Sequence, residues 1–398
     1  MAAEEQITSI FESCPDRTDT DSLKWSRYRG KDILPMWVAD MDFASAEPIL
    51  EALEARVRHG VFGYAMARPA DTQAVIDWVD AEHHWRIEKE WIVWLPGLVP
   101  ALNIACRAFA EPEQEILTFT PIYPPFLSAP TLSQQRLVTC PLRRENNRYT
   151  FDLDMLAKTV TPQTRLLLLC SPHNPVGRVW TRHELDGLTR FCLQRDLLIC
   201  SDEIHCDLVL DEACRHIPTA TLSSEIAQRT ITLMSPAKTF NLPGLNCGVA
   251  IIPNETLRRQ FVRTAAGILP HVNIMGYTAC RAAFTRGGPW HRQLIATLRG
   301  NRDYLIEAIN ALPGLSMGPV EATYLAWIDA TGLKTENPAK WFEHAGVGVV
   351  DGADFAGDGF VRLNFGCPRP LLENAVKRIK TALLSRGNDD AGTKKTAV

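Results

Sequence analysis

The sequence lacks three features: a surplus of basic residues, a hydrophobic run long enough to span a membrane, and a secretory signal. Its 398 residues include 42 Lys or Arg and 46 Asp or Glu, which gives a formal net charge of −4. Without a basic surface, nucleic acid and anionic membranes are poor candidate partners. Residues 1–6 are acidic and lack the basic and apolar regions of a signal peptide. We therefore expect a cytoplasmic protein.

The sequence also lacks paired cysteines. Its eleven cysteines are scattered, and none belongs to a C-x-x-C motif. An odd, dispersed set is typical of reduced and mostly buried thiols. Cys200, Cys206 and Cys214 are close in sequence, but no matching His/Cys set surrounds them. We therefore expect no metal site.

The middle of the chain alternates between strand-like and helix-like patterns. Strands are expected at residues 91–95, 115–119, 136–140, 164–170, 197–201, 229–234 and 248–252. This alternation predicts an α/β fold with a doubly wound, mainly parallel sheet. Thr164–Cys170 is almost entirely apolar, as expected for a parallel strand that is covered on both faces.

The C-terminal third has a different pattern, and a chain of this length is expected to form about two domains. Helices expected at 255–267 and 289–312 precede short strands at 323–328, 346–350 and 360–365 and a last helix at 371–385. This α+β pattern predicts a second, smaller domain. We expect an N-terminal arm over residues 1–45 that joins the small domain, a large domain over 46–288, a small domain over 289–386 and a disordered tail over 387–398.

The arm contains a run, Ile33–Phe43, that mixes aromatic and apolar residues with Asp40 and Asp42. Two interpretations remain open. The run packs on a domain with Asp42 as a turn former, or it lines a pocket.

Chemically capable side chains follow four of the expected strands. They are Tyr123, Asn174, Asp202 and the pair Ser235 and Lys238. Because ligands bind at the C-terminal ends of strands in such sheets, these groups can converge on one pocket. A lysine between two buried strands has a lowered pKa and can attack carbonyl groups. The turn Pro96–Pro100, between a strand and a helix, is a phosphate-binding arrangement.

The order of these motifs resembles a known family. Asn174-Pro-x-Gly, Asp202-Glu-x-His, Ser235-x-x-Lys and Arg362 resemble the fold-type I enzymes that use pyridoxal 5′-phosphate (PLP) and are related to class I and II aminotransferases. The runs MWVADMDF, FGY, SPHNPVGRVW, SDEIHCDLVL, SPAKTFNLPGLNCG and VRLNFGCPR resemble the cystathionine β-lyase or C–S lyase branch, of the MalY/PatB type. The resemblance covers nearly the whole chain. It implies a large domain with a mainly parallel seven-stranded sheet flanked by helices, and a smaller α+β domain.

The resemblance also implies roles around the cofactor ring. Lys238 would carry PLP as a Schiff base, and Asp202 would keep the pyridine nitrogen protonated. Asn174 would bond the 3′-oxygen and Tyr123 would stack on the ring. His205 either supports the ring or Asp202, or is simply a packed histidine.

The resemblance further implies how the phosphate and the substrate are bound. The phosphate would contact the backbone N–H groups of Gly97, Leu98 and Val99, the hydroxyl of Ser235, and Tyr64 from a second subunit, so a homodimer with shared sites is expected. Arg362 would clamp the substrate α-carboxylate, with Tyr64 and Asn174 beside it. The family often has Ser at position 237 and Arg at position 246. Ala237 and Asn246 stand there in this chain, so the expected phosphate contacts are less charged than in aminotransferases.

The implied activity is an α,β-elimination in cysteine and methionine metabolism. L-Cystathionine or a related cysteine S-conjugate would yield a thiol, pyruvate and ammonia. Lys238 would act as general base, and Lys238 or Tyr123 would protonate the thiolate. Two alternatives remain open: an aminotransferase on the same scaffold, and a protein whose main role is to bind a regulator, as in the MalY branch.

Overall fold

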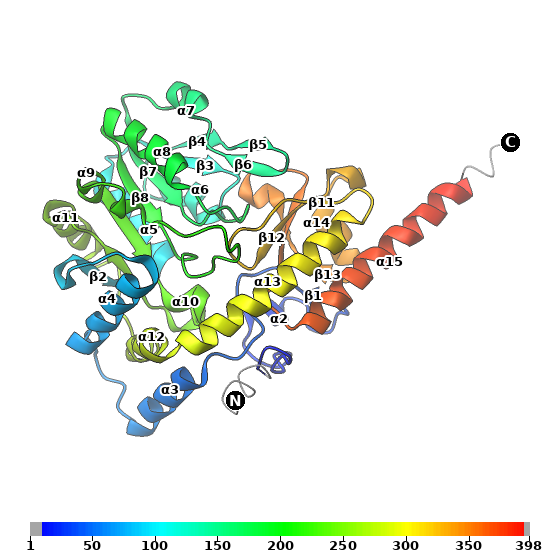
Figure 1. The fold of residues 1–398 in the computed structure, drawn as a ribbon, viewed down its shortest axis with the longest axis horizontal. Coiled ribbons are helices and arrows are strands. Elements are labelled where there is room, and N and C mark those ends of the chain that lie inside the picture. Colours follow the sequence, from blue (N-terminus) through cyan, green and yellow to red (C-terminus); the bar gives the residue numbers. More distant parts are fainter. Residues whose placement is uncertain (1–9, 394–398) are drawn as a thin grey trace.

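The computed structural model describes residues 10–393, with side chains to residue 385. A seven-stranded sheet forms the centre of its larger part, in the order β2-β10-β9-β8-β7-β3-β4 (Figure 1). These strands are β2 (Ile92–Leu95), β3 (Glu115–Thr120), β4 (Arg136–Pro141), β7 (Thr164–Cys170), β8 (Leu198–Asp202), β9 (Thr230–Met234) and β10 (Gly248–Ile251). β10 pairs antiparallel with β2 and β9, and the other neighbours are parallel. The predicted α/β fold is confirmed.

The central strand β7 shows why its run of leucines is needed. Leu166 and Leu168 belong to the hydrophobic core on one face of the sheet, and Leu167 and Leu169 belong to the core on the other face. All four side chains are fully buried. Burial of a Leu side chain stabilises the fold by about 1.5–3 kcal/mol, so this strand contributes to both layers at once.

Helices cover both faces of the large sheet. They are α4 (Pro69–His83), α5 (Leu98–Phe109), α6 (Pro124–Leu132), α7 (Leu153–Thr159), α8 (Arg182–Gln194), α9 (Ser224–Ala227), α11 (Glu255–Ala265) and α12 (Ile274–Arg286). The helix α3 (Glu47–His59) packs on α12 and lies away from the sheet (Figure 1). The capping box expected at α8 is present, with the Thr181 side chain accepting from the Glu184 backbone. The sequence did not predict α6 or α12. Pro124 and Pro125 indicated a rigid loop after Tyr123, but proline is compatible with the first turn of a helix, and Tyr123 is the N-cap of α6.

A smaller sheet, β11-β12-β15-β14, is antiparallel throughout. Its strands are β11 (Ser316–Met317), β12 (Leu325–Asp329), β14 (Val350–Asp351) and β15 (Phe360–Asn364), and its helices are α13 (Gly288–Asn310), α14 (Pro338–His344) and α15 (Arg369–Thr393). In Figure 1 the long helix α13 runs from the large part towards the small one. α15 continues through 387–393, where a disordered tail was expected. The expectation rested on the polar composition of that stretch, which does not by itself exclude a helix. Residues 394–398 of the expected tail lie outside the described residues.

The described part of the arm packs against the small domain. Its strand β1 (Leu34–Pro35) pairs in parallel with β13 (Val347–Gly348). Phe11, Met36 and Phe43 share one hydrophobic core with residues of the small domain. These contacts tie the arm to the opposite end of the chain.

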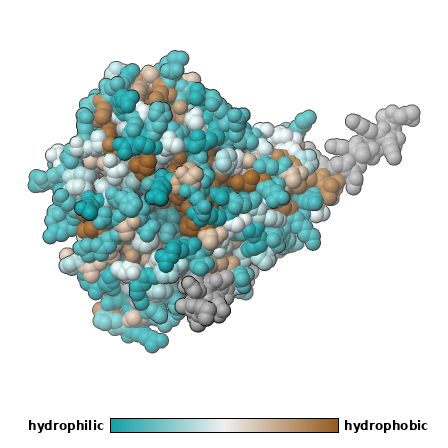
Figure 2. Space-filling view, in the orientation of Figure 1, coloured by the Kyte–Doolittle hydropathy of each residue, from teal (hydrophilic) through white to brown (hydrophobic). Residues whose placement is uncertain are grey.

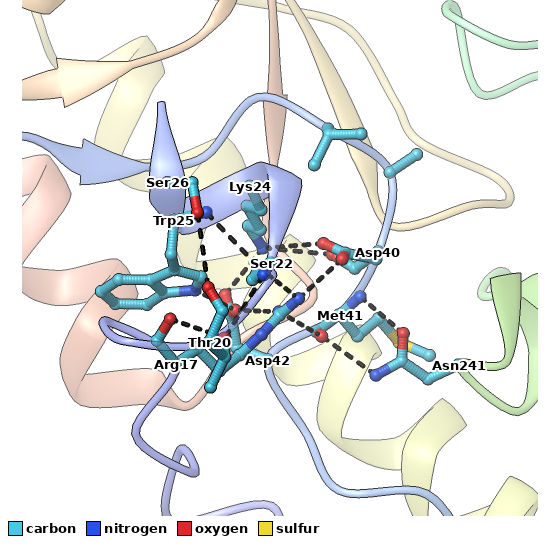
Figure 3. Close-up of polar contacts among 12 residues, drawn as sticks. Arg17, Thr20, Ser22, Lys24, Trp25, Ser26, Asp40, Met41, Asp42 and Asn241 are labelled. Carbon is cyan, nitrogen blue, oxygen red and sulfur yellow. Dashed lines mark hydrogen bonds and ion pairs between the residues drawn. The ribbon is translucent and has the colours of Figure 1, made fainter. Parts of the chain in front are cut away.

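A cluster of charged side chains fixes the arm next to its short helix α2 (Leu23–Ser26). Lys24 Nζ lies 2.7 Å from Asp42 Oδ2, and both side chains are 1% exposed. Arg17 bridges Asp40 and Asp42, with 2.8 Å to each carboxylate (Figure 3). Asp42 is therefore a buried ion-pair partner, and the turn-former interpretation is not needed. Asn241 anchors the same segment by donating to the Met41 carbonyl at 3.0 Å.

The outer surface is ordinary for a globular chain. Figure 2 shows a mostly hydrophilic face on which apolar side chains gather in small groups. No helix in residues 10–393 is long and apolar enough to cross a membrane.

Candidate active site

A cavity of about 290 Å³ opens at the C-terminal edge of the large sheet. It gathers all the predicted site residues except Tyr64: Gly97, Leu98, Val99, Tyr123, Asn174, Asp202, His205, Ser235, Lys238 and Arg362. Tyr64 lies in the segment between α3 and α4 and is fully exposed. Val38 and Ala39 of the arm also line the cavity, so the pocket-lining interpretation of Ile33–Phe43 agrees with the geometry.

Lys238 lies on the one-turn helix α10 (Pro236–Thr239), which follows β9 directly. Ser235 caps this helix by accepting from the Ala237 backbone N–H at 3.1 Å. Lys238 Nζ donates to the Ala39 carbonyl oxygen at 2.6 Å. Burial and the charge of Arg362 lower the Lys238 pKa to about 8, although Asp40 and Asp202 act in the opposite direction. The neutral, nucleophilic amine is therefore accessible at mildly alkaline pH.

Asp202 is the last residue of β8 and is buried beside the cavity. Its Oδ1 accepts from the Ile204 backbone N–H at 3.1 Å. Burial, helped by the charge of Glu203, raises the Asp202 pKa to about 7, although the Ile204 hydrogen bond and Lys238 act in the opposite direction. A cation placed against this carboxyl group would favour its charged form.

Arg362 is a buried cation on β15 with unsatisfied donors. Nη1 donates to Asn174 Oδ1 at 3.1 Å and Nη2 to the Trp37 carbonyl at 3.3 Å. Nε is buried without a hydrogen-bond partner, and no carboxylate among the described residues pairs with the guanidinium. Burial lowers the Arg362 pKa to about 10, so the group stays charged at neutral pH. An unpaired buried cation is costly, and a bound carboxylate would compensate that cost.

Tyr123 and His205 complete the polar lining near the lysine. Burial raises the Tyr123 pKa, although the Arg362 charge lowers it. Burial, together with the charges of Lys238 and Arg362, lowers the His205 pKa to about 3. His205 is thus a neutral imidazole, and its buried Nδ1 has no partner among the described residues.

The N-terminus of α5 forms another part of the cavity lining. Gly97 has φ 149°, a conformation that a side chain rarely permits, and it directs the chain into the helix. The N–H groups of Leu98 and Val99 in the first turn have no intrahelical acceptor, which suits an anion. Ser235 donates its hydroxyl to the Cys247 carbonyl at 2.7 Å, so an anion here depends mainly on backbone donors.

The sequence did not assign a role at the lysine to three groups that the structure places there. The Ala39 carbonyl accepts from Lys238 and also from the Tyr324 hydroxyl at 2.9 Å. Asp40 acts on the Lys238 pKa through its charge. The MWVADMDF run, which contains Ala39 and Asp40, indicated that this segment could line a pocket. The position of Tyr324 before an apolar strand also fits a core residue, so the sequence did not indicate a role for Tyr324 at the site.

The chain belongs to the aminotransferase class I and II family, whose model matches residues 32–379. The curated relative cystathionine β-lyase PatB from Bacillus subtilis (strain 168) is 36% identical over 385 residues, which cover 94% of this chain and 99% of PatB. The crystal structure of OvoB is 48% identical with a TM-score of 0.92, covering 94% of this chain and 98% of that one. The structure of cystalysin from Treponema denticola, which contains PLP, is 31% identical with a TM-score of 0.90, over 94% and 98% of the two chains. The family resemblance predicted from the sequence is confirmed.

The residues that line this cavity fit PLP. The partly buried Lys238, with its lowered pKa, suits the cofactor aldehyde, and the buried carboxyl group of Asp202 suits the ring nitrogen. The helix N-terminus opened by Gly97 suits the phosphate. All three line the same cavity.

Proposed function

We propose that this chain is a PLP-dependent carbon–sulfur lyase. It would cleave L-cystathionine or a related cysteine S-conjugate to a thiol, pyruvate and ammonia. The observation that carries the proposal is the unpaired, buried guanidinium of Arg362 in the same cavity as Lys238. The carboxylate of an amino-acid substrate would pair with the Arg362 guanidinium, and the substrate α-carbon would then lie near the Lys238 amine. The relationship to PatB, a cystathionine β-lyase, supports the choice of reaction.

The roles of the residues follow from their positions. PLP, when bound, supplies an electron sink for the charge that develops at the substrate α-carbon. Lys238 would hold the cofactor aldehyde, Asp202 its ring nitrogen and Asn174 its 3′-oxygen, with Tyr123 against the ring. The first-turn N–H groups of α5 would hold the phosphate.

Proton transfer is assigned to Lys238. Its pKa of about 8 leaves enough neutral amine to remove the α-proton, and the resulting ammonium can donate to the Ala39 carbonyl. The same ammonium then protonates the leaving thiolate. Tyr123 is the weaker candidate for this last step because burial raises its pKa. His205 is neutral and holds no acidic proton to give.

We place Tyr64 in the active site of a second subunit, as part of a homodimer. Its full exposure, together with the exposed apolar side chains of Val61, Phe62 and Met66 beside it, supports coverage of this segment by another chain. A cytoplasmic location is also proposed, and the eleven free cysteines support it. Mixed dimers test the shared site. Tyr64→Ala and Lys238→Ala each inactivate their own homodimer, and mixing them should restore activity through one intact site.

The decisive experiment for the reaction separates lyase from aminotransferase. With L-cystathionine alone, we expect pyruvate and thiol to be released in equal amounts, and Lys238→Ala should abolish the release. Product formation only after addition of a 2-keto acid acceptor would instead establish the aminotransferase. The regulator-binding alternative predicts an unchanged partner complex in the Lys238→Ala protein and no turnover in the wild type.

A further inference from the structure

A second cavity, of about 400 Å³, lies apart from the site described above and contains several groups that commonly bind metal ions. His83, Cys206 and Asp207 each offer one ligand atom, and these atoms lie within 4.8 Å of one another. All three residues are buried. We propose that they form a binding site for a divalent transition-metal ion. Imidazole, thiolate and carboxylate together favour zinc over the hard cations magnesium and calcium.

The ligands are already oriented by their neighbours. Asp207 Oδ1 accepts from Trp78 Nε1 at 3.2 Å, and Oδ2 accepts from the Thr239 hydroxyl at 2.9 Å. Hydrogen bonds of this kind orient the ligands of known metal sites. His83 Nε2 lies 2.9 Å from Asp207 Oδ1. Two ligands of a tetrahedral zinc lie roughly 3.4 Å apart, given bonds of about 2.1 Å, so this pair has to separate by only about half an ångström. The bound ion replaces the proton that His83 and Asp207 share.

His216 lines the same cavity but is not one of the three grouped ligands. Its Nε2 lies 2.8 Å from Glu203 Oε2, and its buried Nδ1 has no partner among the described residues. A histidine that is oriented by a carboxylate on one nitrogen and free on the other is a common metal ligand. The rings of His83 and His216 are 5.4 Å apart, and both residues line this cavity. The three grouped residues therefore leave one position of a four-coordinate zinc ion open, and His216 lies in the same cavity.

The expectation of no metal site rested on neighbours in the sequence. Asp207 lies 124 residues after His83, the last residue of α4, so no short motif could reveal the set. The ion would tie α4 to the loop after β8. Through Asp207 and Thr239, that loop contacts α10, the helix of Lys238. The site is lined by other residues than the cavity assigned to the proposed lyase reaction, so it does not depend on that reaction.

The test is metal titration of untagged holoenzyme that has been freed of metals with a chelator. Zn²⁺ should bind at one ion per chain in competition with a chromogenic chelator. Co²⁺ in the same site should give a thiolate-to-metal charge-transfer band and strong visible bands of tetrahedral geometry. Cys206→Ser should remove the charge-transfer band, and Cys206→Ser and His83→Gln should each weaken Zn²⁺ binding at least tenfold. Cys214→Ser is the matched control, because Cys214 lines the same cavity but is not among the three ligands.

Three results would overturn the proposal. They are less than stoichiometric binding, a Co²⁺ complex of the wild type without a thiolate band, or a loss of that band in Cys214→Ser but not in Cys206→Ser. The wild-type cobalt spectrum decides the matter even if a variant fails to fold, since it requires no substitution. Pyruvate release is not the readout, so failure of this proposal and failure of the proposed function are distinguishable.

Discussion

The amine of Lys238 donates a 2.6 Å hydrogen bond to the backbone carbonyl of Ala39, 199 residues earlier in the chain. Tyr324 donates to the same oxygen at 2.9 Å. The acceptor belongs to the arm, while the two donors come from the large and small parts of the molecule. This one carbonyl therefore connects three regions at the reacting group, and the partly buried lysine has no direct carboxylate partner among the described residues.

Replacing that lysine should stabilise the cofactor-free protein while it destroys activity. The Lys238 pKa falls from 10.5 to about 8 on folding, a penalty on the charged form of about 3 kcal/mol, since one pKa unit is about 1.4 kcal/mol. Lys238→Met removes this penalty and loses the Ala39 hydrogen bond, so we expect a net gain of about 1–2 kcal/mol at pH 7. Urea unfolding of the apoproteins measures it. The exposed Lys340→Met is the control and should change stability by less than about 0.5 kcal/mol. A less stable Lys238→Met protein would contradict the assignment.

The same group predicts a pH dependence of stability with a defined sign. Below pH 8 both the folded and the unfolded chain bind the Lys238 proton, and the penalty is present in full. Between pH 8 and 10.5 only the unfolded chain binds it, so the contribution of Lys238 to stability rises with pH. The advantage of Lys238→Met over wild type should therefore shrink across this window. Unfolding free energies at pH 7, 8, 9 and 10 test it, and a constant difference would show that burial does not shift the Lys238 pKa.

Arg362→Met should raise the pKa of Lys238, because the Arg362 charge is one cause of the lowering. Only the neutral amine attacks an aldehyde. The rate of PLP attachment to the wild-type apoprotein should rise with pH through about 8, and the variant should show its midpoint at higher pH. Stopped-flow absorbance gives both curves. Arg144→Met, a substitution at an arginine that pairs with Asp329 away from the cavity, is the control and should leave the midpoint unchanged.

Arg362→Lys should weaken substrate binding although it keeps the charge. Lysine cannot offer the planar fork that grips both oxygens of a carboxylate, and a charge-assisted hydrogen bond contributes about 1.5–3 kcal/mol. A loss of at least tenfold in kcat/KM for L-cystathionine is expected, with the PLP absorbance of the holoenzyme retained. Steady-state kinetics check this. Equal kcat/KM in both proteins would place the carboxylate elsewhere.

Breaking the ion cluster of the arm should be costly. Asp42→Asn leaves Lys24 buried, with Asp40 Oδ1 3.9 Å away as the nearest remaining carboxylate oxygen. Removal of one partner of a buried pair typically costs about 3–5 kcal/mol. The double variant Lys24→Met/Asp42→Leu removes both charges and should be less destabilised than Asp42→Asn. Chemical denaturation of all three proteins measures the difference, and an order in which the double variant is the least stable would argue against an unpaired-charge mechanism.

Much of the fold was predictable from local patterns. The unbroken apolar run of β7 indicated a mainly parallel sheet, and the structure contains a seven-stranded, mainly parallel sheet. The polar residues Asp202 and Ser235 at strand ends indicated the edge of the sheet at which a ligand would bind. The helix α6 was not predicted, since Pro124 and Pro125 fit a loop and a first helical turn equally well. The polar groups at the strand ends do line one cavity, as expected, but their roles in the chemistry remain predictions.

What the sequence could not supply was contact between distant segments. The Ala39 carbonyl is a backbone atom without any residue signature. The hydrogen bond from the Ser235 hydroxyl to the Cys247 carbonyl depends on the pairing of β9 with β10. The buried Lys24 was also unexpected, because lysine is usually exposed and its partner Asp42 lies 18 residues later. Such features depend on tertiary packing, which the local pattern of hydrophobic and polar residues does not reveal.

The pairing of β1 with β13 has a consequence for synthesis on the ribosome. Leu34 meets Val347, so the arm cannot take its place until nearly the whole polypeptide has emerged. The wall of the cavity formed by Val38 and Ala39 is thus translated among the first segments and positioned among the last. A nascent chain carries Lys238 long before that wall closes over it, and productive loading with cofactor becomes a post-translational event.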